Sequence, residues 1–274
     1  MSAVVYAVTN QKGGVAKTTT TASLAAALQA RGLKVLVVDL DPQACLTFSL
    51  GYDPDDLSPT LHEVVTGRQN LTSTVLSHDE CDLAPANLDL SGAEVALLSR
   101  TGREYVLRAQ IEDLRDSYDA IFLDCPPSLG VLTLNGLTAA DQVVIPVQCE
   151  TLSHRGVSQL LETIADVQHL TNRDLTIAGL VATMYDGRTN HAREVLADMQ
   201  SRYDLKVIGV PVRKSIRFSE APNNGHTILT HAPKVPGAAA YRVIAAELHG
   251  LKALPGDRAA AEGEKKSQGK GNAQ

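Results

Sequence analysis

The 274-residue chain contains no tryptophan, and aromatic residues make up only 4% of it, although apolar residues of all kinds make up 44%. A core with so few rings must consist mainly of Val, Leu, Ile and Ala side chains. That composition is typical of buried parallel strands covered by helices. The length suits one large α/β domain, with two small domains as the alternative.

Cysteine is scarce, and its spacing excludes two common uses of the residue. The cysteines are far apart and never form a C-x-x-C pair, so neither a zinc site nor a redox pair is indicated. The histidines are also scattered without ligand spacing. We therefore expect small, reduced core residues at the cysteine positions, which are Cys45, Cys81, Cys125 and Cys149.

Long apolar runs and a charged leader are also absent. No apolar run reaches the ~18 residues of a spanning helix, and the first residues continue directly into a predicted strand. We expect a cytoplasmic protein without membrane association. The net charge of −6 argues against a protein that coats nucleic acid with its whole surface, but it leaves room for a local basic patch.

The most informative stretch that is present covers residues 9–20, with the sequence TNQKGGVAKTTT. Residues 3–8 before it are apolar and rich in β-branched side chains, and apolar residues recur at helical spacing after it. In a strand, loop and helix arrangement, backbone N–H groups of the loop and the helix start form a concavity that favours a polyphosphate. Lys17 would reach the β- and γ-phosphates, and Thr18 would hold Mg²⁺.

This stretch departs from the general phosphate-loop pattern G-x-x-x-x-G-K-[ST], because Gln11 and Ala16 stand at its two glycine positions. It resembles instead the deviant Walker A motif K-G-G-x-x-K-[ST] of the ParA/MinD superfamily of ATPases, with Lys12 as the additional signature lysine. Ala16 replaces the usual glycine there. Because alanine resists positive φ, the loop should keep its shape if residue 16 is right-handed and distort if it is not. The alternative is a Gly-Gly turn with incidental lysines.

The order of the other apolar segments predicts the fold. Strands alternate with helices, which indicates a single doubly wound, mostly parallel sheet with helices on both faces, the α/β fold of deviant P-loop NTPases. Beyond about Leu251 the apolar periodicity ends, so we expect an ATPase domain over 1–250 and a disordered low-complexity tail over 251–274. The later strands are expected at 34–41, 81–86, 120–124, 142–147, 177–183 and 207–210, and helices at 104–114, 153–170 and 190–203.

Three aspartates, Asp39, Asp41 and Asp124, lie at the ends of predicted strands. Because parallel strands bring their carboxyl ends to the edge where the phosphate loop lies, we expect these side chains to meet beside a polyphosphate. Mg²⁺ takes oxygen ligands and often keeps several waters, so Thr18 would bind it directly and the carboxylates would orient its waters. A helix cap or a turn is the alternative role for any one aspartate.

The resemblance to the ParA family extends over about residues 3–249. Asp124 resembles the family's Walker B aspartate, and Asp41 matches the second aspartate of its A′ motif, which is implicated in positioning the attacking water. Two departures from the family fall at 44–46, after the A′ motif, and at 212–215. Further segments that look like the chromosomal ParA branch are 126–130, 146–150, 183–190 and 219–222.

This resemblance implies a partition ATPase that dimerises with itself when ATP and Mg²⁺ bind. In the family the signature lysine, here Lys12, contacts the partner's ATP across the dimer, so the catalytic residues would be Lys12, Asp41 and Asp124; an ordinary surface lysine is the alternative for Lys12. The dimer would hold double-stranded DNA of the nucleoid without sequence preference until a ParB-like centromere-binding protein stimulates hydrolysis. The implied nucleotide-binding residues are Lys12, Gly13, Gly14, Val15, Ala16, Lys17, Thr18 and Thr19, with Met184 and Pro211 around the adenine, and the implied Mg²⁺ site comprises Thr18, Asp39, Asp41 and Asp124.

A basic segment at 206–217 favours DNA as a partner, because it contains no carboxylate in an otherwise acidic chain. It also lacks aromatic stacking residues, so contacts would be made with phosphates and would be blind to sequence. A solvated basic face is the alternative. The predicted DNA contacts are Arg188, Arg213, Lys214 and Arg217.

Three other functions remain open. A MinD-like membrane-cycling ATPase would need a C-terminal amphipathic helix with bulky apolar and basic faces, and the chain after His249 offers only Leu251 and Leu254. An amidoligase or synthetase with the same loop would need a substrate pocket that the sequence does not reveal. The third possibility keeps the ParA mechanism and replaces the chromosome or plasmid by another cellular cargo.

Overall fold

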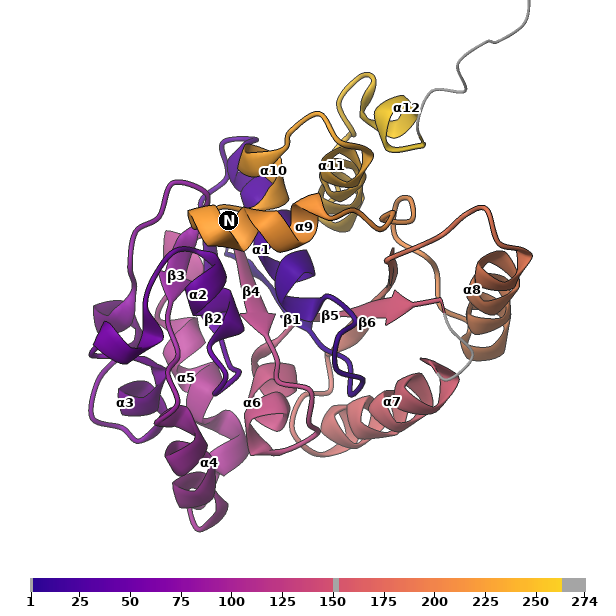
Figure 1. Cartoon of the computed structure of the whole chain (residues 1–274). Helices are drawn as coiled ribbons and strands as arrows, with labels where there is room; N and C mark the ends of the chain where they lie inside the picture. Colours follow the sequence, from indigo (N-terminus) through magenta and orange to yellow (C-terminus); the bar gives the residue numbers. More distant parts are fainter. Residues whose placement is uncertain (1, 150–152, 263–274) are drawn as a thin grey trace, which may run out of the picture.

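A computed structural model describes residues 2–149 and 153–262 of the chain. Its six-stranded sheet has the order β3-β2-β4-β1-β5-β6, and all neighbouring strands are parallel (Figure 1). The predicted doubly wound parallel fold is confirmed. The strands are β1 (Val4–Val8), β2 (Val35–Asp39), β3 (Asp82–Ala84), β4 (Ala120–Asp124), β5 (Gln142–Gln148) and β6 (Thr176–Thr183).

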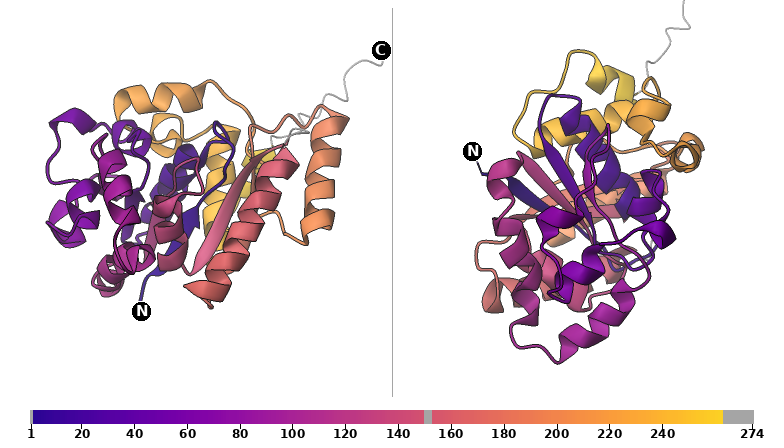
Figure 2. Two further views of the ribbon diagram at one scale, coloured as in Figure 1. Left: turned by 90° about the horizontal axis from the view of Figure 1, so that it is seen from below. Right: turned by 90° about the vertical axis from the view of Figure 1, so that its left-hand side faces the viewer.

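Helices cover both faces of this sheet (Figure 2). One face packs against α1 and α11, and the other packs against a row of helices that includes α5, α6 and α7. Within residues 2–149 and 153–262, no helix is both long and apolar enough to cross a membrane. The helices are α1 (Lys17–Gln29), α2 (Cys45–Ser49), α3 (Leu61–Val65), α4 (Leu90–Leu98), α5 (Val106–Glu112), α6 (Val131–Ala139), α7 (Ser153–Leu170), α8 (Asn190–Tyr203), α9 (Arg217–Glu220), α10 (Ile228–His231), α11 (Pro236–Leu248) and α12 (Asp257–Glu262).

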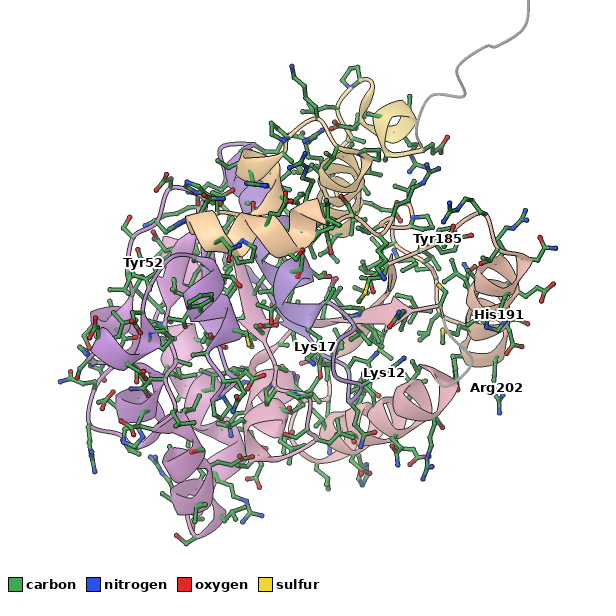
Figure 3. The ribbon with its side chains drawn as sticks, in the orientation of Figure 1. Lys12, Lys17, Tyr52, Tyr185, His191 and Arg202 are labelled. Atoms are coloured by element: carbon green, nitrogen blue, oxygen red, sulfur yellow. The ribbon has the colours of Figure 1, made fainter. Side chains whose placement is uncertain are left out.

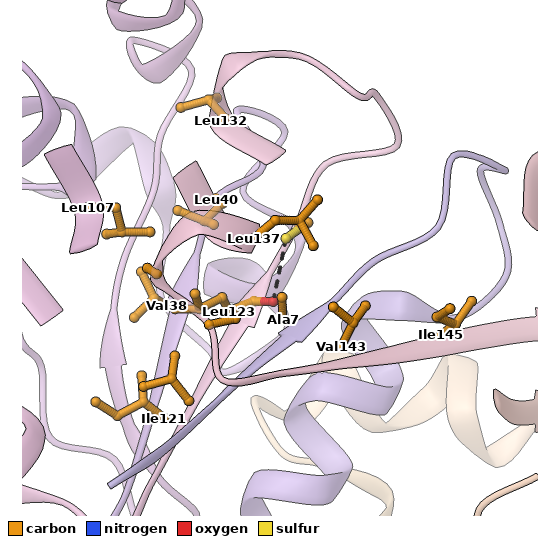
Figure 4. Packing of buried hydrophobic residues seen from close by; sticks show 14 of the residues in the cluster. Ala7, Val38, Leu40, Leu107, Ile121, Leu123, Leu132, Leu137, Val143 and Ile145 are labelled. Carbon is orange, nitrogen blue, oxygen red and sulfur yellow. Dashed lines mark hydrogen bonds between the residues drawn. The ribbon is translucent and has the colours of Figure 1, made fainter. Parts of the chain in front are cut away.

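The two faces divide the side chains of each strand between two cores. In β1, Tyr6 points to the α1 face, whereas Val5 and Ala7 point to the other. Tyr6 stacks on Phe122 of β4, with ring centroids 4.9 Å apart, which places two of the few aromatic residues together. The opposite core is almost entirely aliphatic (Figure 4), as the composition predicted.

Most predicted elements are present, and one predicted strand is wrong. The helices expected at 153–170 and 190–203 match α7 and α8, and Thr189 caps α8 by accepting a hydrogen bond from the Ala192 N–H at 3.3 Å. In the expected strand at 207–210, Val207 forms a single bridge to β6 before the chain turns at Gly209, where φ is 66°. A left-handed glycine in the segment prevents it from continuing as a strand.

The chain after α11 is ordered further than the sequence predicts. Helix α12 packs against α11, with Ala261 only 2% exposed, and Arg242 Nε donates to Asp257 Oδ1 at 2.8 Å. The prediction of disorder is therefore wrong for the segment from Leu251 to Glu262. The remainder of the predicted tail, 263–274, lies outside the described residues.

Candidate nucleotide-binding site

The loop that joins β1 to α1 lies at the carboxyl end of the sheet, where neighbouring strands hold it. The buried Asn10 side chain donates from Nδ2 to the Pro146 carbonyl at 2.8 Å and accepts from the Lys12 N–H at 3.0 Å. Thr183 Oγ1 donates to the carbonyl of loop residue Val15 at 3.0 Å. Sequence analysis missed the anchoring roles of Asn10 and Thr183, because each contacts an element remote in sequence.

Ala16 is left-handed, with φ 64° and ψ 38°, immediately before α1. A left-handed residue 16 was expected to distort the loop, but the start of α1 is regular. The Thr20 N–H donates to the Ala16 carbonyl at 2.9 Å, as in an undistorted helix. A left-handed alanine costs about 1–2 kcal/mol. The loop therefore keeps its route into α1, and the strain falls on one residue.

Ala16→Gly is expected to stabilise the nucleotide-free protein by roughly 0.5–1 kcal/mol, because glycine adopts this conformation without strain and loses part of that gain through its freedom in the unfolded chain. Urea unfolding measures the change. Ala96→Gly, at an exposed helical position in α4, is the matched control and should destabilise by about 1 kcal/mol. Equal destabilisation in both variants would contradict the assignment of strain to Ala16.

Helix α1 brings Lys17 and two hydroxyl groups to the end of β4. Thr18 Oγ1 donates to Asp124 Oδ2 at 2.7 Å, and Thr21 Oγ1 donates to Asp124 Oδ1 at 3.0 Å. Asp124 is 1% exposed and Lys17 is 9% exposed. Figure 3 shows Lys17 beside the loop that carries Lys12. The expected meeting of the loop, Thr18 and the strand-end aspartate is therefore present.

Asp39 and Asp124 are register partners on the neighbouring strands β2 and β4. Burial, together with the Asp124 carboxylate, raises the pKa of Asp39 to about 7. Burial also raises the pKa of Asp124 to about 6, although hydrogen bonds from Thr18 and Thr21 act in the opposite sense. Two carboxylates that resist ionisation together favour an added positive charge. The donors present are hydroxyl and carboxylate oxygens, which Mg²⁺ prefers, so the site fits that ion.

The aspartates at 39 and 41 have different surroundings. Thr47 donates to Asp39 Oδ2 from its N–H at 2.9 Å and from Oγ1 at 2.8 Å, and the Asp41 N–H donates to Asp39 Oδ1 at 3.1 Å. Asp41 is partly buried, and its Oδ1 accepts from the Gln43 N–H at 3.0 Å. Asp39 thus fixes the start of α2 through Thr47. Asp41 lies in the short connection between β2 and α2, where it is partly exposed.

A cavity of about 610 Å³ lies beside the phosphate loop, with Gly14 and Ala16 in its lining. Met184 and Pro211 were both predicted to lie around the adenine; Met184 lines this cavity, whereas Pro211 is not among the described residues that do. Phe218 contributes an aromatic ring to the lining. A concave, largely apolar wall next to a phosphate site suits the flat face of a purine base.

Two of the four predicted DNA contacts form exposed ion pairs. Arg188 Nη2 lies 2.8 Å from Asp186 Oδ2, and Arg217 Nη1 lies 2.8 Å from Glu220 Oε2. The acidic partners lie two or three residues away in sequence, outside the carboxylate-free run itself. Ion pairs that water surrounds are weak, so a DNA phosphate can compete for both arginines.

The other two predicted DNA contacts line the cavity beside the phosphate loop. Arg213 and Lys214 are both in its lining, and Arg213 Nη2 also donates to the Glu262 carbonyl at the end of α12. Sequence analysis missed this contact because it treated the chain after 251 as disordered. The basic residues are therefore divided between the lining of the cavity and the neighbouring surface.

A further cluster of charged groups lies away from the loop. His78, Glu80 and His226 place ligand-type atoms within 4.8 Å of one another, although their sequence spacing gave no indication of it. Glu80 is 7% exposed, and its carboxylate accepts from the Thr227 N–H at 2.7 Å and from Thr230 Oγ1 at 2.7 Å. These bonds commit the carboxylate to fixing the start of α10, so we assign the cluster a structural role.

A strand, a lysine-containing loop and a helix start set beside buried aspartates define a P-loop nucleotide-binding protein. Residues 3–177 match the protein family described as AAA domain. The chain is 43% identical over 249 residues to the uncharacterized protein Rv1708 of Mycobacterium tuberculosis, covering 90% of this chain and 78% of that protein.

Two relatives have names that describe cellular roles. The chain is 40% identical over 246 residues to the sporulation initiation inhibitor protein Soj of Bacillus subtilis, covering 89% of this chain and 97% of Soj. It is 40% identical over 248 residues to the chromosome partitioning protein ParA of Myxococcus xanthus, covering 89% of this chain and 87% of that protein. The chain belongs to the ParA family of ATPases.

Solved structures of similar proteins bear different names. The structure of cobyrinic acid a,c-diamide synthase from Mycobacterium smegmatis, with a bound ATP analogue and magnesium, has a TM-score of 0.79 and 50% identity, covering 89% of this chain and 93% of that one. A Cyanothece McdA variant in complex with ATP has a TM-score of 0.82 and 25% identity, covering 92% of this chain and 98% of the McdA chain. The cell division ATPase MinD of Pyrococcus furiosus has a TM-score of 0.71 and 27% identity, covering 91% of this chain and 99% of the MinD chain.

Proposed function

We propose that this chain is an Mg²⁺-dependent ATPase that partitions DNA. The observation that carries the proposal is the loop with Lys12 and Lys17 beside the buried Asp124, in a member of the ParA family. The β- and γ-phosphates of ATP would lie against the loop N–H groups and Lys17. Thr18, with the nearby carboxylates, would hold Mg²⁺, which neutralises phosphate charge when it is bound.

The remaining nucleotide contacts in this proposal involve the cavity beside the phosphate loop and Asp41, which lies between β2 and α2. Met184 and the cavity wall would enclose the adenine, and Asp41 would orient the attacking water from its partly exposed position. Two ATP-bound chains would form a homodimer in which Lys12 reaches the partner's nucleotide. Charge supplied across an interface in this way is worth about 10³–10⁵ in rate.

DNA would be bound through its phosphates by Arg188, Arg213, Lys214 and Arg217, without sequence preference. Dimerisation would present two copies of this set to one duplex, which raises the effective concentration of contacts without changing any residue. A ParB-like partner would then stimulate hydrolysis and release. We accordingly place the protein in the cytoplasm, at the nucleoid.

Binding to a duplex of arbitrary sequence, with and without Mg²⁺-ATP, tests the proposal. Wild-type protein is expected to bind when ATP is present, and Arg217→Glu is expected to lose affinity by at least about tenfold, because each dimer loses two cationic contacts and gains two repulsive ones. Glu220→Gln is the matched control, since it frees Arg217 from its ion pair and should bind at least as tightly as wild type.

The outcome is decisive in two ways. Equal DNA binding with and without ATP would mean that nucleotide does not act as the switch. Unchanged affinity in Arg217→Glu, with ATP-driven dimerisation intact by light scattering, would place the DNA surface elsewhere.

A second candidate function rests on the likeness to the cobyrinic acid a,c-diamide synthase of Mycobacterium smegmatis. An enzyme of that class couples ATP hydrolysis to amide formation on a carboxylic acid substrate. ATP hydrolysis should then rise when cobyrinic acid and an ammonia donor are added, and DNA should have no effect. Stimulation by DNA and a ParB-like protein, without any response to cobyrinic acid, would favour the partition ATPase.

A further inference from the structure

A second cavity, of about 520 Å³, is lined by Arg217 and by residues 231–235. Arg217 belongs to α9, whereas residues 231–235 run from the last residue of α10 to the residue before α11. Figure 1 shows α9 next to α10, and α10 next to α11. Among the described residues, this cavity shares no lining residue with the cavity beside the phosphate loop, so the two are separate features.

The lining of this second cavity is basic. Its titratable side chains are Arg217, His231 and Lys234, and none of the described residues in the lining is acidic. Lys234 is exposed and forms no ion pair within residues 2–149 and 153–262. Guanidinium and ammonium groups both donate to phosphate oxygens, so a concave surface with these groups suits a phosphate. We call it the basic cavity.

Glu220 shows that an anion can contact two of these groups at once. Its Oε2 lies 2.8 Å from Arg217 Nη1 and 3.5 Å from His231 Nε2. A hydrogen bond from Arg217, with a weaker effect from His231, lowers the pKa of Glu220, so the carboxylate is ionised at neutral pH. The Glu220 side chain is 40% exposed, and water weakens contacts of this kind. A phosphate oxygen can therefore replace the carboxylate on both groups.

We propose that Arg217, His231 and Lys234 together bind one phosphate of the DNA backbone, which displaces Glu220 as it binds. The proposal rests on the DNA binding proposed above and deepens it. It adds His231 and Lys234, which no sequence motif indicated, and it makes Glu220 an internal competitor of DNA. The contact carries no sequence information, because every nucleotide presents the same phosphate.

Lys234→Gln tests the proposal in the full chain with a random-sequence duplex and Mg²⁺-ATP. We expect at least about a fivefold loss of affinity near 0.1 M salt and a less steep salt dependence, because each dimer loses two cations that face DNA phosphates. Lys34→Gln is the matched control, since Lys34 is also exposed but precedes β2 and does not line the cavity. It should bind DNA as tightly as wild type.

A double-mutant cycle of Arg217→Gln and Lys234→Gln tests whether the two residues share a phosphate. Side chains that hold one phosphate depend on each other, so the affinity loss of the double variant should be smaller than the product of the single losses by at least about threefold. Single losses that multiply without such a deficit would mean separate phosphates and would contradict the shared site.

The competition by Glu220 has its own test. Glu220→Gln should bind DNA at least about threefold more tightly than wild type, because the two carboxylates that a dimer must displace are gone. Affinity equal to that of wild type would refute the competition. Light scattering in ATP checks that each variant still dimerises and is therefore folded.

Wild-type protein separates this proposal from the one on which it rests. Wild type that fails to bind DNA under any nucleotide condition would refute the proposed function itself. Wild type that binds, together with Lys234→Gln of equal affinity and equal salt slope, would overturn the basic cavity alone. Calorimetry with a slowly hydrolysed ATP analogue tests the other source of phosphate. Loss of nucleotide binding in Lys234→Gln would assign the cavity to ATP and would likewise overturn the proposal.

Discussion

Lys17→Ala is expected to abolish Mg²⁺-ATP binding, whereas Asp41→Ala is expected to bind ATP within a few-fold of wild type and to lose hydrolysis. Lys17 is the first residue of α1, directly after the phosphate loop, and it is 9% exposed. Removing it takes away the main side-chain charge that balances the phosphates. Asp41 lies outside the loop and is partly exposed, so its loss removes a water-orienting group and leaves the phosphate contacts in place.

Calorimetric titration with a slowly hydrolysed ATP analogue and a phosphate-release assay measure the two effects separately. Lys34→Ala, a lysine at the opposite end of the sheet before β2, is the control and should match wild type in both assays. Equal loss of binding in Lys17→Ala and Asp41→Ala would refute the division of roles between the loop and the A′ aspartate.

A mixture of two inactive proteins, Lys12→Ala and Asp41→Ala, is expected to regain hydrolysis. Each variant alone should lose activity by about 10³-fold or more, the scale of a missing charge supplied across an interface. In a mixed dimer, the Lys12→Ala chain keeps its own Asp41 and receives Lys12 from its partner, so one of the two sites is complete. With random pairing at equal amounts, about a quarter of wild-type activity should return.

The mixing experiment needs proof that mixed dimers form, which differently tagged chains and co-purification in ATP provide. A lysine acting on its own chain's nucleotide would leave every site in the mixture incomplete. Mixed dimers without recovered hydrolysis would therefore refute action across the dimer. A mixture of Arg31→Ala with Asp41→Ala is the control for effects of mixing two variants. Arg31 follows the C-terminal end of α1, far from the loop, and its side chain donates to the Lys252 carbonyl.

The sequence predicted the parallel sheet, the position of the loop and the approach of Thr18 to Asp124. These features depend on periodicity and on the rule that parallel strands end at one edge, both of which can be followed along the chain. The different surroundings of Asp39 and Asp41 could not be predicted in the same way. They arise because Thr47, six residues beyond Asp41, turns back onto Asp39, and that turn depends on tertiary packing.

Two other features were not predicted, each for a different reason. Composition made the segment after Leu251 look disordered, because six residues of helix α12 offer few apolar side chains and depend on Arg242 of α11 for their attachment. The ion pairs of Arg188 with Asp186 and of Arg217 with Glu220 were not predicted either, because both acidic residues lie outside the carboxylate-free run at 206–217. For α12, a contact with another helix decided the outcome, and the local sequence carries no record of such a contact.

The strand order has a consequence for synthesis of the protein. β1 is made first, yet its partners in the sheet are β4 and β5, which begin at Ala120 and Gln142. The phosphate loop also lacks one of its anchors until Thr183 has been made, because Thr183 Oγ1 donates to the Val15 carbonyl. At about 5–20 residues per second, a ribosome needs roughly 10–40 seconds to reach that residue. β1 therefore has no neighbour in the sheet until β4 has been made, and the loop lacks this anchor for longer still, so nucleotide bound to a fully anchored loop can assist only the late part of folding.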